Sequence, residues 1–124
     1  MTYHSCIVCI GSNCNRKENL LLAQTRLTEL FPSIRFTSEQ ETQPLFLKNP
    51  ALFSNQLAFF LSEIGEEEVK MQLKAIERSA GRCAEDKIKE KVCLDIDLLS
   101  FDGRVLKPED WKREYVVKGL EELK

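Results

Sequence analysis

Two carboxylates two residues apart in an apolar segment are the clearest candidates for chemistry in this chain. Asp95 and Asp97 lie in residues 94–101, LDIDLLSF, whose composition predicts a strand. Alternate strand residues share one face and are roughly 6.5 Å apart along the axis. Such a pair can bind one or two divalent cations, and a few hard oxygen ligands favour Mg²⁺. The alternative is the solvent-exposed polar face of an edge strand.

Four cations, mixed with Glu85, Asp86 and Glu90, lie just before this predicted strand. Arg82 follows the glycine that ends a predicted helix, and Lys87, Lys89 and Lys91 lie in the polar segment after it. An arginine beside a metal-bound phosphate is a natural anion ligand, and the lysines could cover a nucleotide. The alternatives are an arginine that only interacts with the helix dipole and a plain solvated loop.

Phe53 and Asn55 share a face of another predicted strand, directly after a loop predicted over residues 41–50 with two prolines. An aromatic ring can stack on a flat heterocycle, and an amide can pair with its edge. The alternative for Phe53 is ordinary core packing. His4 is the sole histidine, so a histidine-based triad or metal cluster is not available, and a structural role is expected.

Length and composition predict one globular domain over residues 1–124, with 43% hydrophobic and 31% charged residues. The net charge of -2 gives no basic field for nucleic acid. The apolar N-terminal run does not resemble a signal peptide, and no run approaches the ~20 residues of a membrane span, so a cytoplasmic protein is expected. The odd cysteine count predicts reduced thiols at Cys6, Cys9, Cys14, Cys83 and Cys93.

Hydrophobic periodicity predicts the order β-α-β-β-α-β. Strands are expected over residues 3–10, 34–39, 55–64 and 92–101, and helices over 15–31 and 66–80. Asn15 and Glu18 suggest a capping box, and Asp102-Gly103 a turn before a short strand over 104–107. The tail from Pro108 carries no clear pattern. The order predicts an α+β, ferredoxin-like fold, an antiparallel sheet with both helices on one face.

The motifs, taken in order, resemble the 6-hydroxymethyl-7,8-dihydropterin pyrophosphokinases of folate synthesis. That family transfers the β,γ-pyrophosphate of ATP to the hydroxymethyl oxygen of the pterin and releases AMP. The resemblance runs over nearly the whole chain, through residues 10–13 (IGSN), 41–45 (ETQPL), 53–55 (FSN), 76–77 (IE), 81–82 (GR), 94–97 (LDID) and 113–117 (REYVV).

The resemblance also implies roles for individual residues. The metal ligands would be Asp95 and Asp97, holding two Mg²⁺ ions. The polar residues of the catalytic centre would be Glu77, Arg82 and Arg113, and ATP would also meet Lys89 and Lys91. The pterin would be bound by Gly11, Thr42, Pro44, Leu45, Phe53, Asn55 and Tyr115. The partners are therefore small molecules, with no nucleic acid or membrane, and a monomer and a dimer are both open.

The chain departs from the family where ATP would be held. Ala84 and Val92 stand where the family has arginines, Lys107-Pro108 stands near the place of a Pro-His pair, and the chain is shorter at its C-terminal end. Each lost charge-assisted bond to a transferring phosphate costs on the order of 100-fold in rate. Three functions follow: a pyrophosphokinase that these losses slow, a degenerate member that binds pterin or nucleotide without transfer, and a ferredoxin-like protein-interaction module.

Overall fold

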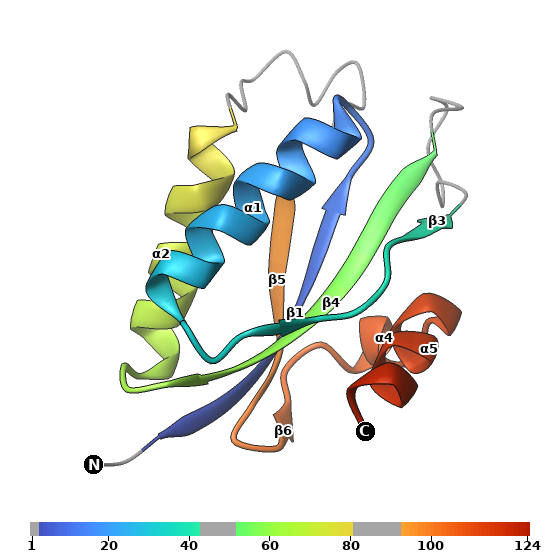
Figure 1. The fold of residues 1–124 in the computed structure, drawn as a ribbon. Coiled ribbons are helices and arrows are strands. Elements are labelled where there is room, and N and C mark those ends of the chain that lie inside the picture. The colour runs from blue at the N-terminus through green and yellow to red at the C-terminus, as the bar shows by residue number, and fades with distance from the viewer. Residues whose placement is uncertain (1–2, 43–51, 81–92) are drawn as a thin grey trace.

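The computed structural model describes residues 3–42, 52–80 and 93–124, and it contains one antiparallel sheet (Figure 1). The strand order is β2-β4-β1-β5-β6, and β3 also pairs with β4. The strands are β1 (His4–Ser12), β2 (Arg35–Phe36), β3 (Gln40–Thr42), β4 (Phe53–Ser62), β5 (Asp95–Phe101) and β6 (Arg104–Val105). The helices are α1 (Arg16–Leu30), α2 (Glu66–Ser79), α4 (Pro108–Trp111) and α5 (Glu114–Leu123).

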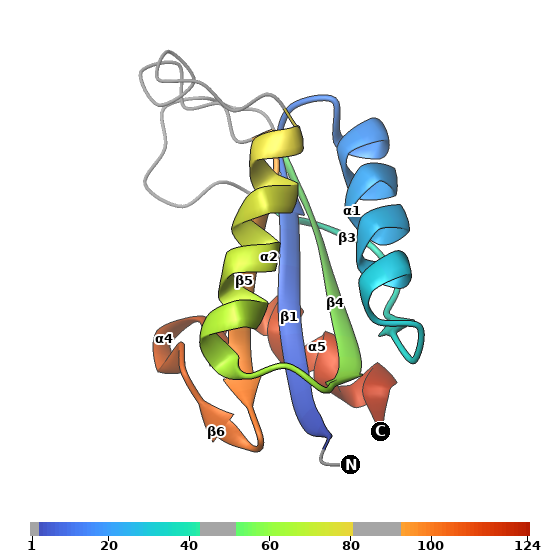
Figure 2. The same ribbon diagram turned by 90° about the vertical axis from the view of Figure 1, so that its left-hand side faces the viewer.

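The main core lies between the sheet and helices α1 and α2, which cover one face (Figure 2). Leucines and other apolar residues at helical spacing form the buried stripe of each helix, Leu20, Ala23 and Leu27 on α1 and Val69, Leu73 and Ile76 on α2. The sheet contributes alternate residues, Cys6, Val8 and Ile10 of β1 among them. The predicted α+β, ferredoxin-like class is therefore confirmed.

The C-terminal tail forms helices α4 and α5 on the opposite face of the sheet (Figure 1). A second and smaller core lies there, made of Cys9, Leu57, Leu99 and Val116. The sequence left this tail unassigned. The prediction that the helices lie on one face therefore holds for α1 and α2, while the tail gives the other face a partial cover.

Close packing and hydrogen bonds fix α5 on the sheet. A Cβ built on Gly119 would lie 2.5 Å from Leu57 Cδ1, so only glycine allows the helix to approach β4 this closely. Glu122 Oε1 accepts hydrogen bonds from the backbone N–H and the hydroxyl of Ser38, both at 2.9 Å. The position of α5 therefore depends on the strand residues beneath it and on the segment between β2 and β3.

We expect Gly119→Ala to destabilise the protein. Overpacking costs about 1–3 kcal/mol, against a gain of up to about 1 kcal/mol from the helix propensity of alanine. Thermal unfolding should show a lower Tm for Gly119→Ala. The exposed neighbour substitution Lys118→Ala should change stability by no more than about 0.5 kcal/mol. The penalty should shrink in a Leu57→Val background, and an equal penalty there would show that the contact with Leu57 is not its cause.

Several predicted boundaries are wrong for identifiable reasons. Asn15 adopts a left-handed backbone, φ 46°, and its side chain makes no capping hydrogen bond, so the predicted capping box does not form. The strand predicted over 34–39 is broken at Thr37, whose hydroxyl accepts the N–H of Leu57 at 3.0 Å. Strand β3 extends into the predicted loop as far as Thr42, and β4 begins at Phe53, two residues before its predicted start.

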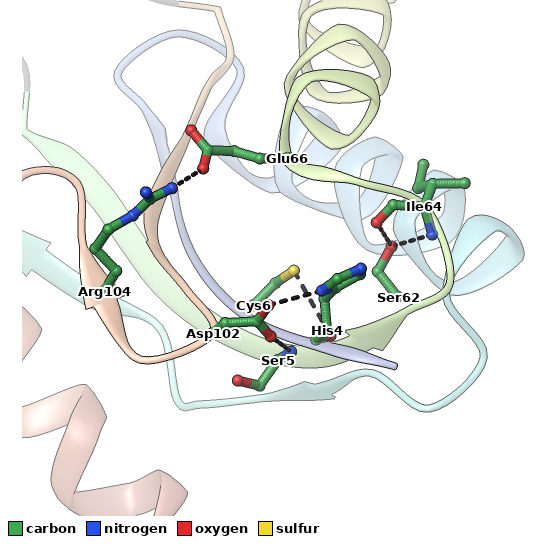
Figure 3. A network of polar contacts seen from close by, with 8 residues as sticks. All are labelled: His4, Ser5, Cys6, Ser62, Ile64, Glu66, Asp102 and Arg104. Carbon is green, nitrogen blue, oxygen red and sulfur yellow. Dashed lines mark hydrogen bonds and ion pairs between the residues drawn. The ribbon is translucent and has the colours of Figure 1, made fainter. Parts of the chain in front are cut away.

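A polar network ties the β5–β6 hairpin to the N-terminal end of β1 (Figure 3). Asp102 and Gly103 form the predicted turn, with φ values of 52° and 80°. The Asp102 carboxylate accepts hydrogen bonds from His4 Nδ1 at 2.7 Å and from the Ser5 N–H at 3.0 Å. The His4 ring also stacks on Phe101, with ring centroids 4.8 Å apart. The single histidine is thus a structural residue, as predicted.

Cys6, Cys9 and Cys14 are free thiols in the described part of the chain. Cys6 belongs to the main core and Cys9 to the smaller one, so the C-x-x-C pair is divided between the two faces of the sheet. Within residues 3–42, 52–80 and 93–124, no helix combines the length and the apolar character that crossing a bilayer requires.

Candidate functional site

The sheet register places the predicted pterin and metal residues side by side. Gly11 of β1 lies between Asn55 of β4 and Asp95 of β5, and Asn55 has Gln40 of β3 on its other side. This row crosses the sheet at the C-terminal end of β1. Because paired residues of adjacent strands point to one face, the four side-chain positions share the face opposite α1 and α2.

Asp97 lies one step further along the same face, beside Cys9. Both aspartates are partly buried. Burial, the charge of Asp95 and a hydrogen bond between the two carboxyl groups raise the pKa of Asp97 to about 6, and Asp110 adds to this effect. Lys107 acts in the opposite direction. Two carboxylates are therefore held together at a cost that a bound cation would offset.

The amide of Asn55 lies at the centre of the row and is almost completely buried, with 7% of its surface exposed. Its Nδ2 donates to Thr42 Oγ1 at 2.6 Å. A Cβ on Gly11 would lie 3.3 Å from Asn55 Oδ1, which leaves little room for any other residue there. Phe53 precedes Asn55 by two residues, pairs with Thr42 in the register and shares the same face. These contacts define one edge of the site.

The start of α5 forms a second edge of the site. Gln40 Nε2 donates to the carbonyl oxygen of Tyr115 at 3.0 Å, which ties this helix to β3. Tyr115 is partly buried against the smaller core, and burial, with the nearby Cys9, raises the pKa of its phenol. Arg113 precedes the helix, and its Nε donates to Asp110 Oδ1 at 3.0 Å. Tyr115 is close enough to Asp97 and Arg113 for both charges to affect its pKa, and Arg113 directly precedes its helix.

Glu77 lies on the other side of β5. It is 6% exposed, and its Oε2 accepts the N–H of Ile96, the residue between the two aspartates, at 2.7 Å. The side chain comes from α2, which packs on the helix-covered face. Glu77 therefore holds the strand that carries the aspartates from the helix-covered side.

Five predicted site residues fall outside the described part of the chain. They are Pro44, Leu45, Arg82, Lys89 and Lys91. Ala84 and Val92, where the family has arginines, also lie in these ranges. Their predicted roles stay predictions.

The family model of the 7,8-dihydro-6-hydroxymethylpterin-pyrophosphokinases (HPPK) matches residues 7–124, which is nearly the whole chain. The chain belongs to the HPPK family. A search of curated proteins returned no match to this chain. The pyrophosphokinases of this family act in folate synthesis and use ATP and Mg²⁺. The row of Asn55, Gly11 and Asp95 is the candidate site for the HPPK reaction.

The donor set suits the Mg²⁺ of an HPPK. Asp95 and Asp97 supply hard oxygen ligands from one strand face, and Mg²⁺ takes few protein carboxylates and fills its other positions with water and phosphate oxygens. Among the described residues there is no group of three or more His, Cys, Asp or Glu side chains that could hold a metal. The Asp95–Asp97 pair thus fits an ion whose other positions are filled by water and phosphate oxygens.

Sequence reasoning missed two polar residues of this site, Gln40 and Asp110. Asp110 precedes Arg113 by three residues, a spacing at which opposite charges pair when the backbone turns helically, so this contact was open to prediction. Gln40 carried no such signal. It faces Asn55 only because the chain breaks its strand at Thr37 and resumes pairing at Gln40.

We expect Asp97→Asn to stabilise the metal-free protein more at pH 8 than at pH 5. The folded-state pKa of Asp97 is raised to about 6, from about 4 in an unfolded chain. Protonation of Asp97 therefore stabilises the fold relative to the protein with an ionised Asp97. This stabilisation is complete below pH 4 and is lost as the pH rises through 6. The measurement is Tm in a chelator at both pH values. Glu63→Gln, at an exposed position, is the control and should show no such trend. An equal Asp97→Asn effect at both pH values would contradict the repulsion.

Proposed function

We propose that this protein transfers the β,γ-pyrophosphate of ATP to the hydroxymethyl oxygen of 6-hydroxymethyl-7,8-dihydropterin and releases AMP. The observation that carries the proposal is the row in which Asn55, Gly11 and Asp95 lie on adjacent strands. It supports the proposal because the Asn55 amide, which would bind the heterocycle, and the Asp95–Asp97 pair, which would bind the metal, share one face. The family match supplies the reaction class.

The pterin would lie over Gly11, with its polar edge at Asn55. Asn55 offers an amide oxygen and a second N–H, since one N–H already donates to Thr42. Phe53 and Tyr115 approach from β4 and α5 and would contact the two faces of the ring. Because Gly11 has no side chain, a flat ligand has space to lie against the strand. This orientation would direct the hydroxymethyl group along the row toward Asp95.

Asp95 and Asp97 would act at the triphosphate of ATP. Asp95 and Asp97 would hold Mg²⁺, which neutralises triphosphate charge and orients the β-phosphorus for in-line attack. The pterin oxygen forms a bond to the β-phosphorus, its proton is lost, and the bond to the oxygen bridging the α- and β-phosphates breaks, leaving that oxygen on AMP. Arg113 would donate to phosphate oxygens from the opposite side. Glu77 would keep β5 in place through Ile96.

A second function, binding without transfer, is favoured by two sequence positions. Ala84 and Val92 replace family arginines that would contact the triphosphate. Two such losses would each cost on the order of 100-fold in rate. Under this reading pterin and nucleotide still bind, but AMP formation does not exceed the background.

The test is a turnover assay with purified protein, ATP, the hydroxymethyl-dihydropterin and Mg²⁺. We expect AMP and the pterin pyrophosphate in equal amounts, and neither when Mg²⁺ is chelated or the pterin is left out. Calorimetry with the pterin and a non-hydrolysable ATP analogue runs in parallel. Binding without AMP would favour the second function, and absence of both would favour the interaction module.

A further inference from the structure

We propose that Asp110 is the positioning residue for Arg113, and that the pair acts as one unit at the phosphate end of the site. The inference rests on the proposed function for its catalytic readout, because that function gives Arg113 a phosphate to bind. The contact itself stands on geometry. Arg113 Nε donates to Asp110 Oδ1 at 3.0 Å, and both side chains are about a third exposed, 34% and 30%.

The local backbone makes the pairing close to obligatory. Asp110 lies in α4 and Arg113 immediately before α5, and the Arg113 N–H donates to the Asp110 carbonyl oxygen at 3.1 Å. The Arg113 carbonyl in turn accepts the N–H groups of Val116 and Val117, both at 3.0 Å. Arg113 is therefore fixed at its backbone from both helices. Its side chain has one further anchor, the Asp110 carboxylate.

The choice of nitrogen determines what the guanidinium can still bind. Asp110 takes the Nε–H, so the two terminal Nη groups are the donors that remain for the oxygens of a phosphate. An arginine held at Nε loses less conformational entropy when it binds than one with a free side chain. Asp110 thus presents the end of the guanidinium that suits a phosphate.

The pair also lies beside the aspartates. Asp110 affects the pKa of Asp97, and Asp110 and Arg113 together affect the pKa values of Cys9 and Tyr115. Cys9 is the register partner of Asp97, so the guanidinium and the metal-binding carboxylates belong to one neighbourhood. Lys107, which opens α4, adds a second cation there. A free carboxylate at position 110 would repel phosphate, and its pairing with Arg113 removes that cost.

The experiment is a double-mutant cycle of Asp110→Ala and Arg113→Ala, with Asp110→Asn as the conservative variant. The measured quantities are the affinity for a non-hydrolysable ATP analogue with Mg²⁺, and KM and kcat where the protein turns over. We expect Asp110→Ala to weaken analogue binding about tenfold in the presence of Arg113. In the absence of Arg113 it should not weaken binding, because the unpaired carboxylate would itself repel phosphate. Asp110→Asn, which keeps the oxygen acceptor, should recover part of the loss. Glu109→Gln, the exposed neighbour, should have no effect.

A second readout does not depend on substrate. The Arg113 Nε–H resonance should exchange slowly with water in the wild-type protein and rapidly in Asp110→Ala, while Tm reports whether the variant still folds. If wild-type protein forms no AMP, the proposed function fails, and the analogue cycle with the resonance still decides the inference. Asp110→Ala losses of equal size with and without Arg113, or an Nε–H that exchanges at the same rate in both proteins, would overturn it.

Discussion

Asp97→Asn should lower kcat for AMP formation by at least two orders of magnitude. The substitution keeps the size of the side chain and its place beside Cys9, but it removes one of the two charges that the site offers to Mg²⁺. Loss of a charged group that stabilises a transferring phosphate costs about 3–4 kcal/mol, or 10²–10³ in rate. Asp95→Asn should have an effect of similar size. The measurement is the initial rate of AMP release at saturating ATP and pterin.

The same variant separates catalysis from stability. Asp97→Asn should unfold at a higher temperature than the wild type at neutral pH, because the repulsion with Asp95 is gone. Glu63→Gln should keep both the wild-type rate and the wild-type Tm. If Asp97→Asn retains more than a tenth of the wild-type rate at saturating Mg²⁺, the aspartate pair does not hold the catalytic metal.

Asn55→Ala should weaken pterin binding on the order of 100-fold, with a smaller effect on the affinity for ATP. A site built to hydrogen-bond a heterocycle loses much of its affinity when the buried donor and acceptor are removed. Asn55 is nearly inaccessible to solvent and is held by Thr42, so no neighbouring side chain can take its place without rearrangement. Titration calorimetry with the pterin, with and without the ATP analogue, measures the loss.

The adjacent Ser54→Ala supplies a matched control. Ser54 precedes Asn55 on β4, so its side chain points to the opposite face, where it accepts a hydrogen bond from Arg16 at 3.1 Å. We expect unchanged pterin affinity in Ser54→Ala. Equal losses in both variants would mean that the start of β4 had been disturbed as a whole, and unchanged binding in Asn55→Ala would place the pterin elsewhere.

The sequence predicts the fold well because the apolar spacing is regular. Residues 6–10 form a continuous apolar run, typical of a strand covered on both faces, and β1 does contribute to both cores. Val69, Leu73 and Ile76 form one helical stripe that faces the main core. The alternation of strand residues correctly placed Asp95 and Asp97 together. Period alone did not reveal the tail, because α4 is a single turn and α5 is amphipathic over only Glu114–Leu123.

The parts of the site that sequence could not supply depend on contacts between distant residues. Gly119 has a low helix propensity, yet it is the residue at which α5 packs against Leu57. Gln40 gains its role only after β3 pairs with β4. The resemblance assigns Glu77 to the polar residues of the catalytic centre, whereas its hydrogen bond to the Ile96 N–H depends on how α2 packs beside β5. Such relations are tertiary and leave no local pattern.

The division of the interior into a large and a small core has a kinetic consequence. Helix α5 carries Tyr115 and follows directly on Arg113, but it rests on the smaller core, on the Gly119 contact and on a few hydrogen bonds. Segments with little buried apolar contact open at lower free energy than the central strands, without unfolding of the whole molecule. We therefore expect the Tyr115 side of the proposed pterin site to open more often than the sheet that bears the aspartates. Ligand that binds against this side shifts the population toward the closed form, so part of its binding energy is spent on ordering the site.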